Sequence, residues 1–379
     1  MSRTALATIH LGALRRNLAR VCERAHGAKV MAVVKADGYG HGLERVARAF
    51  ADADALGVAA LGDGLRLRAA GHRQRIVVLS GPDEPADLAE FRRLQLDAVI
   101  HHEAQLAWLE GDRSGPDRSG QRLRVWLKID TGMHRLGFPP EKTAETHARL
   151  RALANVDPDI TLMTHFAASD EFDNALTAWQ IDAFMSATQH LEGARALANS
   201  AALIGWPDAQ GGGAAGDVRR GNGSAYWVRA GGLLYGLSVI AGKSGRDLGF
   251  EPAMTLTTKL ISIQHLKKGE RIGYAATWQC PEDMPVGVAA IGYGDGYPRS
   301  VAADTPVLVE GQRARIVGRV SMDLVTIDLR GIDAPSVGDR VVLWGRDLPV
   351  EEIAGHAGTI SYDLTCGMTR RVLFVEDPE

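Results

Sequence analysis

The chain has 379 residues, of which 45% are hydrophobic and 23% charged, a composition typical of a soluble globular protein with room for a large domain and a second one. A formal net charge of −3 excludes the overall basic field of a nucleic-acid-binding protein, and no apolar run reaches the ~18 residues that a membrane span requires. Three widely separated cysteines, Cys22, Cys280 and Cys366, form no CxxC pair and the N-terminus has no signal-peptide pattern, so we expect a reducing, cytoplasmic location.

The first two-thirds of the chain alternates short apolar runs with stretches of helical periodicity, which predicts repeated strand–helix units around a parallel sheet. The length of this region favours a (β/α)8 TIM barrel, usually about 250 residues long, over an open doubly wound sheet. We place this domain at residues 1–241. The expected strands are Val30–Val34, Ala55–Ala60, Ile76–Leu79, Ala98–Ile100, Arg124–Ile129 and Ile160–Thr164, and the expected helices are Leu43–Ala51, Gly62–Ala70, Glu103–Leu109, Glu141–Ala154 and Leu176–Leu191.

Residues 242–379 have a different texture, in which strand-like segments follow one another with turn sequences between them. This pattern predicts a mostly β C-terminal domain. For residues 1–10 the sequence leaves two alternatives: they belong to the barrel, or they pair with this second domain. The expected strands are Met254–His265, Val286–Ile291, Thr305–Val309, Ala314–Val317, Leu324–Leu329 and Arg340–Leu343.

A Gly-rich polar segment, Ala209–Tyr226, interrupts the first domain and predicts a mobile surface loop. It contains a formal G-x-G-x-x-G at Gly211, Gly213 and Gly216. That pattern binds a dinucleotide only between a strand and a helix, whereas a turn precedes it here, so it gives little support to nucleotide binding.

The most informative motif is AVVKADGYGHG, Ala32–Gly42, in which a buried strand ends at Lys35 and a Gly-rich turn with a tyrosine follows. A lysine at the C-terminal end of a barrel strand points into the face where barrel active sites form. Burial favours its neutral amine, a nucleophile able to form a Schiff base with a carbonyl compound.

This motif closely resembles the cofactor-lysine segment of the bacterial alanine racemases, two-domain barrel enzymes that use pyridoxal 5'-phosphate (PLP), and the resemblance extends over nearly the whole chain. It implies that Lys35 carries the cofactor and that no metal is needed. The residues matching those around the PLP phosphate are Tyr39, Ser200, Gly231, Gly232 and Tyr362, with the two glycines offering backbone N–H groups.

Further motifs of this resemblance imply roles around the ring and the substrate. In VWLKIDTGMHRLGF, Val125–Phe138, Arg135 matches the arginine that binds the substrate carboxylate, for which its planar charged fork is suited. Lys128 matches a lysine that is often carbamylated, although an ordinary strand-end lysine is the alternative. His165 in MTHFAASD matches the histidine that stacks on the PLP ring. Arg229 in VRAGGLLYG matches the arginine that faces the pyridine nitrogen of PLP, and an arginine there would leave this nitrogen unprotonated.

Motifs of the second domain complete the resemblance. RIGYAATW, Arg271–Trp278, matches the segment of the catalytic tyrosine, here Tyr274, while Tyr293 in IGYGDGYPR would narrow the substrate entrance. Met322 in GRVSMDL would offer its backbone N–H to the substrate carboxylate. The resemblance implies racemisation of alanine by two bases on opposite faces of the α-carbon, Lys35 for D-alanine and Tyr274 for L-alanine.

Family members form head-to-tail homodimers with shared active sites, so the resemblance implies that Tyr274 and Met322 act across the interface. One departure is that the chain between Ser200 and Arg229 is longer than usual, either as an inert insertion or as one that alters access. The remaining alternatives are a barrel-type PLP-dependent amino-acid decarboxylase, a broader-specificity amino-acid racemase and a non-catalytic PLP carrier. The sequence leaves open whether the D-alanine serves peptidoglycan or the reaction belongs to alanine catabolism.

Overall fold

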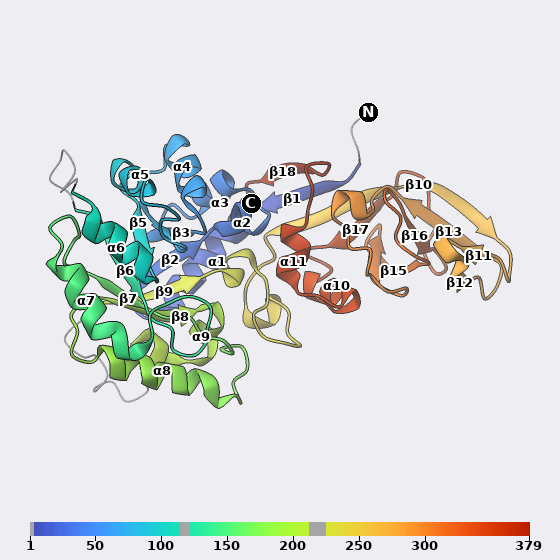
Figure 1. The fold of residues 1–379 in the computed structure, drawn as a ribbon. Coiled ribbons are helices and arrows are strands. Elements are labelled where there is room, and N and C mark those ends of the chain that lie inside the picture. The colour runs from blue at the N-terminus through green and yellow to red at the C-terminus, as the bar shows by residue number, and fades with distance from the viewer. Residues whose placement is uncertain (1–3, 114–121, 212–224) are drawn as a thin grey trace.

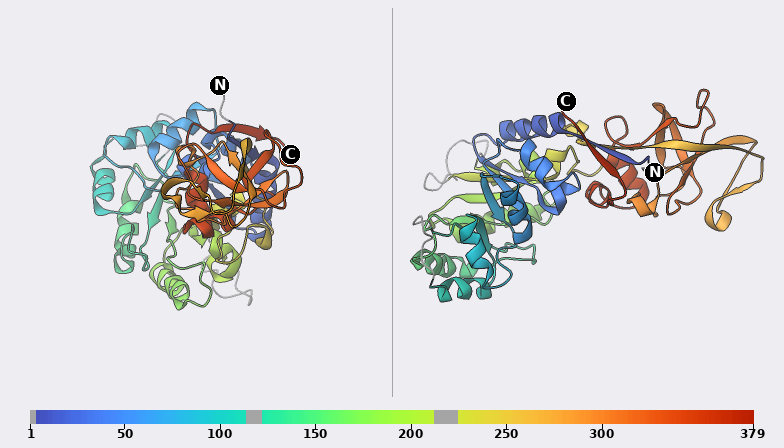
Figure 2. Two further views of the ribbon diagram at one scale, coloured as in Figure 1. Left: turned by 90° about the vertical axis from the view of Figure 1, so that its right-hand side faces the viewer. Right: turned by 90° about the horizontal axis from the view of Figure 1, so that it is seen from above.

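The computed structural model describes residues 4–113, 122–211 and 225–379. It places a barrel and a mostly β domain end to end, joined where the N-terminal strand β1 (Leu6–His10) runs beside the C-terminal strand β18 (Leu373–Asp377) (Figures 1 and 2). In the part of the chain that is described, no helix combines the length and apolarity needed to cross a membrane.

The barrel consists of eight parallel strands that close on themselves, which confirms the predicted barrel and excludes the open sheet. The strand β9 pairs in parallel with both β8 and β2 and so completes the circle. The barrel strands are β2 (Lys29–Val33), β3 (Ala55–Val58), β4 (Arg75–Val78), β5 (Asp97–Ile100), β6 (Val125–Lys128), β7 (Thr161–Met163), β8 (Arg195–Asn199) and β9 (Tyr226–Ala230).

Helices follow or lie between these strands, and the predicted helices agree with α3, α4, α6, α7 and α8 to within a few residues. The predicted helix Glu141–Ala154 is shorter in the structure, because a 3-10 turn, Pro140–Lys142, precedes α7. The helices of this domain are α1 (Leu11–Arg24), α2 (Lys35–Tyr39), α3 (Leu43–Ala49), α4 (Leu61–Ala69), α5 (Asp87–Arg93), α6 (Glu103–Gly111), α7 (Thr143–Ala152), α8 (Ala175–Thr188) and α9 (Ser200–Gly205).

The loop predicted at Ala209–Tyr226 is shorter at both ends, because the structure places its first and last residues in other elements. Ala209 is fully buried in a 3-10 turn, Pro207–Gln210, and Tyr226 is the first residue of β9. Gly213 and Gly216 of the glycine pattern, and the mobility predicted for the middle of this segment, fall outside the described residues.

The second domain is an eight-stranded sheet in the order β13-β16-β15-β14-β17-β10-β1-β18, and β10 also pairs with β13. The first strand of the chain, β1, thus belongs to this sheet, between β10 and β18. Its other elements are β10 (Met254–Leu266), β13 (Met284–Ala289), β14 (Pro306–Val309), β15 (Gln312–Val317), β16 (Val325–Asp328), β17 (Arg340–Trp344), α10 (Val350–Ala357), α11 (Ser361–Cys366) and the small hairpin β11 (Arg271–Ile272) and β12 (Trp278–Gln279).

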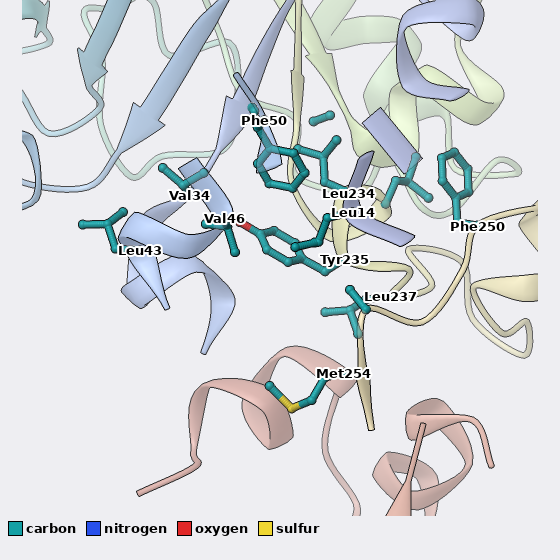
Figure 3. Close-up of a cluster of buried hydrophobic side chains, with 14 of the residues drawn as sticks. Leu14, Val34, Leu43, Val46, Phe50, Leu234, Tyr235, Leu237, Phe250 and Met254 are labelled. Carbon is teal, nitrogen blue, oxygen red and sulfur yellow. The ribbon is translucent and has the colours of Figure 1, made fainter. Parts of the chain in front are cut away.

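A layer of buried side chains fills the barrel interior, so the barrel is a packed core and not a channel. Trp126 and Trp227 pack inside it with ring centroids 5.2 Å apart, and Arg75 lies over both rings. Around Tyr235, buried side chains of α1, α3 and the turn after β9 pack together (Figure 3).

Candidate active site

A cavity of about 950 Å³ lies at the C-terminal ends of the barrel strands, with one wall formed by α10 and α11 of the second domain. Active sites of this fold lie at that end. The cavity brings together the residues predicted from the first domain and one from the second. These lining residues are Lys35, Tyr39, Lys128, Arg135, His165, Ser200, Arg229, Gly231, Gly232 and Tyr362.

Lys35 begins a turn in which the backbone takes the left-handed conformation at successive residues. Ala36, Asp37, Gly38 and Tyr39 have φ angles of 54°, 51°, 65° and 52°. This conformation costs a residue with a side chain about 1–2 kcal/mol, so the turn needs external support. The carboxylate of Asp37 supplies part of it, because Oδ1 accepts hydrogen bonds from Leu43 N at 3.1 Å and from an arginine of α4 at 3.0 Å.

Four cationic side chains face this cavity, and burial disfavours the charged forms of three of them, Lys35, Lys128 and Arg229. Burial, then Arg135 and Arg229, lower the pKa of Lys35. Burial is also the largest cause that lowers the pKa of Lys128 to about 8, followed by repulsion from Arg229, Arg135 and Lys35. The lysines therefore have more neutral amine than a surface lysine, and the cavity as a whole favours an anionic ligand.

Arg229 is held rigidly by carbonyl groups at the ends of two neighbouring strands. Its Nη2 donates to Thr164 O at 2.7 Å and to Leu197 O at 3.2 Å, and Nη1 donates to Ala196 O. Burial lowers its pKa to about 10, which still leaves the guanidinium charged at neutral pH. It can thus only donate hydrogen bonds to a group in the cavity.

His165 is 3.2 Å from Arg229, measured from Nδ1 to Nη2. Burial, then the Arg229 charge, lower the pKa of His165 well below its usual value. Because a guanidinium can only donate, Nδ1 is the accepting nitrogen and the neutral ring carries its proton on Nε2. The ring can therefore pass a hydrogen bond from Arg229 toward the cavity.

Another part of the cavity is lined by hydroxyl groups and by two glycines, whose missing side chains leave room for tyrosine hydroxyls. A Cβ added at Gly231 would lie 2.5 Å from Tyr39 Oη, and one added at Gly232 would lie 2.8 Å from Tyr362 Cζ. Burial raises the pKa of both tyrosines, so their hydroxyls stay protonated donors. Because it is rich in hydroxyl donors, this region suits a phosphate group.

One detail differs from the prediction that both glycine N–H groups are available. Gly231 N already donates to Ser200 Oγ at 2.8 Å, because Ser200 at the start of α9 lies directly opposite the turn after β9. The N–H of Gly231 thus orients the serine, whose own hydroxyl proton is left to donate toward the cavity.

Three predicted residues of the second domain are absent from the described lining of the cavity. Tyr274, Tyr293 and Met322 are 64%, 38% and 51% exposed. Tyr274 lies between β11 and β12, at the tip of the molecule farthest from the barrel (Figure 1). Within one chain, the structure therefore brings together the cofactor side of the predicted site but not its second base.

The sequence analysis missed several residues that the structure places at this site. Asn199 caps α9 by accepting from Ala202 N at 2.9 Å, and an asparagine directly before a short helix is a signal that could have revealed it. Gln180 holds the loop after β7 at two points, accepting from Ala167 N at 2.9 Å and donating to His165 O at 3.2 Å. Nothing in the periodicity of α8 distinguishes Gln180 from an ordinary buried residue.

Comparison with known proteins gives one consistent result. The model of the alanine racemase N-terminal domain matches residues 9–239, and that of the alanine racemase C-terminal domain matches residues 253–375. Alanine racemases of Shewanella woodyi and Vibrio parahaemolyticus are 47% and 45% identical, over 97% and 98% of both chains respectively. The crystal structure of biosynthetic alanine racemase from Pseudomonas aeruginosa superposes with a TM-score of 0.91 at 39% identity and covers 99% of both chains. That of the Acinetobacter baumannii enzyme has a TM-score of 0.90 at 33% identity, covering 99% of this chain and 100% of that one.

Proposed function

The chain belongs to the alanine racemase family of PLP-dependent isomerases, and we propose that Lys35 and Tyr274 are the opposed acid/base groups with which it interconverts L-alanine and D-alanine. The observation that carries this proposal is the position of Lys35, an amine of lowered pKa that lines the cavity at the barrel mouth. Because the chain belongs to this family, the alternative decarboxylase and PLP-carrier activities have no support.

The cavity fits PLP at both of its ends. Lys35 would hold the aldehyde carbon, while Tyr39, Ser200, Gly232 and Tyr362 would hold the phosphate in the part of the cavity that they line together. When bound, the cofactor supplies an electron sink that makes the α-hydrogen of the substrate acidic. Arg229, facing the pyridine nitrogen as a donor that keeps its proton, would leave that nitrogen unprotonated and keep the sink weak.

Arg135 would bind the substrate carboxylate, since its guanidinium lines the cavity beside Lys35 and forms a planar pair with a carboxylate. Met322 of a second copy would add its backbone N–H. We propose that Lys128 is carbamylated, because conversion of this buried cation to an anion would turn its repulsion of Arg135 into attraction.

The two acid/base groups would move protons on opposite faces of the α-carbon. Lys35 would take the α-hydrogen of D-alanine or return a proton to form it, and the hydroxyl of Tyr274 would do the same for L-alanine. The Arg229–His165 hydrogen bond supports this assignment, because a donor relay ending at His165 Nε2 would stabilise the phenolate of a tyrosine beside it.

A head-to-tail homodimer with shared active sites is part of the proposal. Tyr274 and Met322 are more than half exposed in the single chain and lie away from the cavity, as is expected of groups that serve another copy. Tyr293 would narrow the entrance from the same side. We place the functional boundary between residues 1–241 and 242–379, with β1 contributed to the second sheet.

We propose a cytoplasmic enzyme that acts on free alanine, without nucleic acid or membrane as a partner, in agreement with the net charge of −3. Its D-alanine would supply peptidoglycan or its reverse reaction would serve alanine catabolism. The rates with L-alanine and L-serine measured side by side distinguish an alanine racemase from a broader-specificity amino-acid racemase.

Borohydride reduction of the PLP-loaded chain, followed by peptide mass mapping, tests the cofactor assignment. We expect one pyridoxyl label, on Lys35, and none on Lys128, although both lysines line the cavity. In Lys35→Ala the label and the racemisation of L-alanine should both disappear. A label elsewhere, or unlabelled Lys35 in active protein, would overturn the assignment.

A further inference from the structure

Tyr235 lies behind the cavity, fully buried, at the end of the 3-10 turn Gly232–Tyr235 whose first residue faces the proposed phosphate site. Its ring packs among Leu14 of α1, Val46 of α3 and Phe50 at the C-terminal end of α3 (Figure 3). Phe50 meets it edge-on, with centroids 5.8 Å apart at 80°. The mechanism proposed above gives this tyrosine no role.

Two contacts connect Tyr235 with opposite ends of the cofactor site. Its hydroxyl donates to Val33 O at 3.0 Å, and Val33 is the last residue of β2, two positions before Lys35. Its ring stacks on that of Tyr39, with centroids 4.7 Å apart and planes inclined by 28°. The Tyr39 ring lies in turn 5.6 Å from that of Tyr362.

The hydroxyl needs a polar partner, because a buried phenol without a hydrogen bond loses the free energy of its hydration. Burial raises the pKa of Tyr235, which keeps the hydroxyl a donor, and a backbone carbonyl is an acceptor that suits it. A phenylalanine would fill the same space beside these rings without this requirement. The hydroxyl therefore fixes the ring relative to the end of β2.

The ring also supports a side chain that its own backbone positions poorly. Tyr39 has a φ angle of 52°, in the left-handed turn after Lys35, so its conformation depends on packing. Stacking on Tyr235 holds one face of the Tyr39 ring, and the hydroxyl of Tyr39 then points to the space beside Gly231.

We propose that Tyr235 is a positioning residue for PLP: through Val33 it sets the end of the strand that carries Lys35, and through Tyr39 it sets a hydroxyl that binds the phosphate. The inference rests on the proposed function, since it assigns Tyr235 to the same cofactor site. A side chain that only fills the core, as Phe50 does, would support neither the end of β2 nor the ring of Tyr39.

The test compares the dissociation constants of PLP and of pyridoxal, which lacks the phosphate, for the full-length apoprotein, measured by absorbance of the lysine-bound form. Tyr235→Phe removes only the hydrogen bond, so both constants should rise about fivefold together, as expected for one neutral hydrogen bond. Tyr235→Leu also removes the stack, so PLP should lose a further threefold to tenfold relative to pyridoxal, the range for one aromatic pair.

Phe50→Leu is the matched control, because it removes an aromatic ring from the same cluster. In the described structure Phe50 forms a ring pair with Tyr235 but none with Tyr39. It should lower the temperature of unfolding as Tyr235→Leu does, yet leave the ratio of the PLP and pyridoxal constants unchanged. If both Leu variants change this ratio equally, or neither does, Tyr235 is only a core residue. A wild-type chain that fails to bind PLP at Lys35 refutes the proposed function itself and with it this inference.

Discussion

The low pKa of Lys128 makes its proposed carbamylation measurable. A carbamate forms from the neutral amine, and the structure lowers the pKa of this lysine from 10.5 to about 8. At pH 8 about half of the side chains would then be neutral, against roughly 0.3% for an ordinary lysine, an enrichment of more than about a hundredfold. We expect apoprotein given 13C-bicarbonate at pH 8 to show one carbamate carbon signal, absent from Lys128→Gln.

The same pKa makes a prediction about stability. Because the folded-state pKa lies below the unfolded value, the buried ammonium destabilises the fold, and this cost is fully present below pH 8 and disappears as the pH rises through 10.5. In CO2-free buffer at pH 7, Lys128→Gln should therefore unfold with a free energy higher by up to about 3 kcal/mol, with little difference near pH 10.5. Lys128 is 8% exposed, so solvent screens little of this effect.

Bicarbonate at pH 8 should raise the unfolding temperature of the wild-type chain and leave that of Lys128→Gln unchanged. The absence of both the 13C signal and the bicarbonate effect would refute carbamylation and leave Lys128 as a strand-end lysine. If Lys128→Gln instead destabilised the CO2-free protein at pH 7, the repulsion inferred among the buried cations would be wrong.

Three further predictions concern single side chains. Tyr274→Phe should keep the absorbance of bound PLP but slow α-hydrogen exchange from L-alanine by roughly 10²–10⁴, with exchange from D-alanine much less affected; equal losses would contradict the two-base assignment. Gly232→Ala should weaken PLP binding by about tenfold to a hundredfold, because its Cβ would lie 2.8 Å from Tyr362 Cζ, whereas Gly62→Ala, with open space around it, should bind PLP normally. Arg229→Leu should lower the free energy of unfolding in urea by about 3 kcal/mol, since three buried carbonyl groups lose a charged donor; a smaller loss than in Arg313→Leu, an exposed arginine, would refute this reasoning.

The barrel could be predicted from the sequence where its strands are continuous apolar runs, as in β2 and β4. The strands β8 and β9 were not predicted as strands, because Arg195, Asn199 and Arg229 interrupt their apolar pattern. These polar residues are tolerated since tertiary contacts satisfy them: Arg195, for example, donates to Thr188 O at 2.9 Å. Periodicity reports burial against apolar neighbours and cannot show a buried guanidinium whose partners are backbone carbonyls.

Most cofactor-side residues of the site could be identified from motifs, because each lies at a strand end or in a turn with a distinctive sequence. The left-handed turn at Ala36–Tyr39 could not, since alanine and tyrosine have no local preference for it and distant groups on α4 and α11 support it. The same holds for Tyr235, whose two partners are about 200 positions earlier in the chain. Such roles depend on packing between remote segments.

The proposed division of the site between two copies is supported by charge as well as by geometry. Lys35, Lys128, Arg135 and Arg229 crowd the cavity of one chain, and burial lowers the pKa of three of them. A phosphate, a substrate carboxylate and a carbamate on Lys128 would each add negative charge among these cations. A phenolate on Tyr274 of a second copy would be stabilised by the same field, so the cations that destabilise the empty cavity are also what would allow a tyrosine to act as a base.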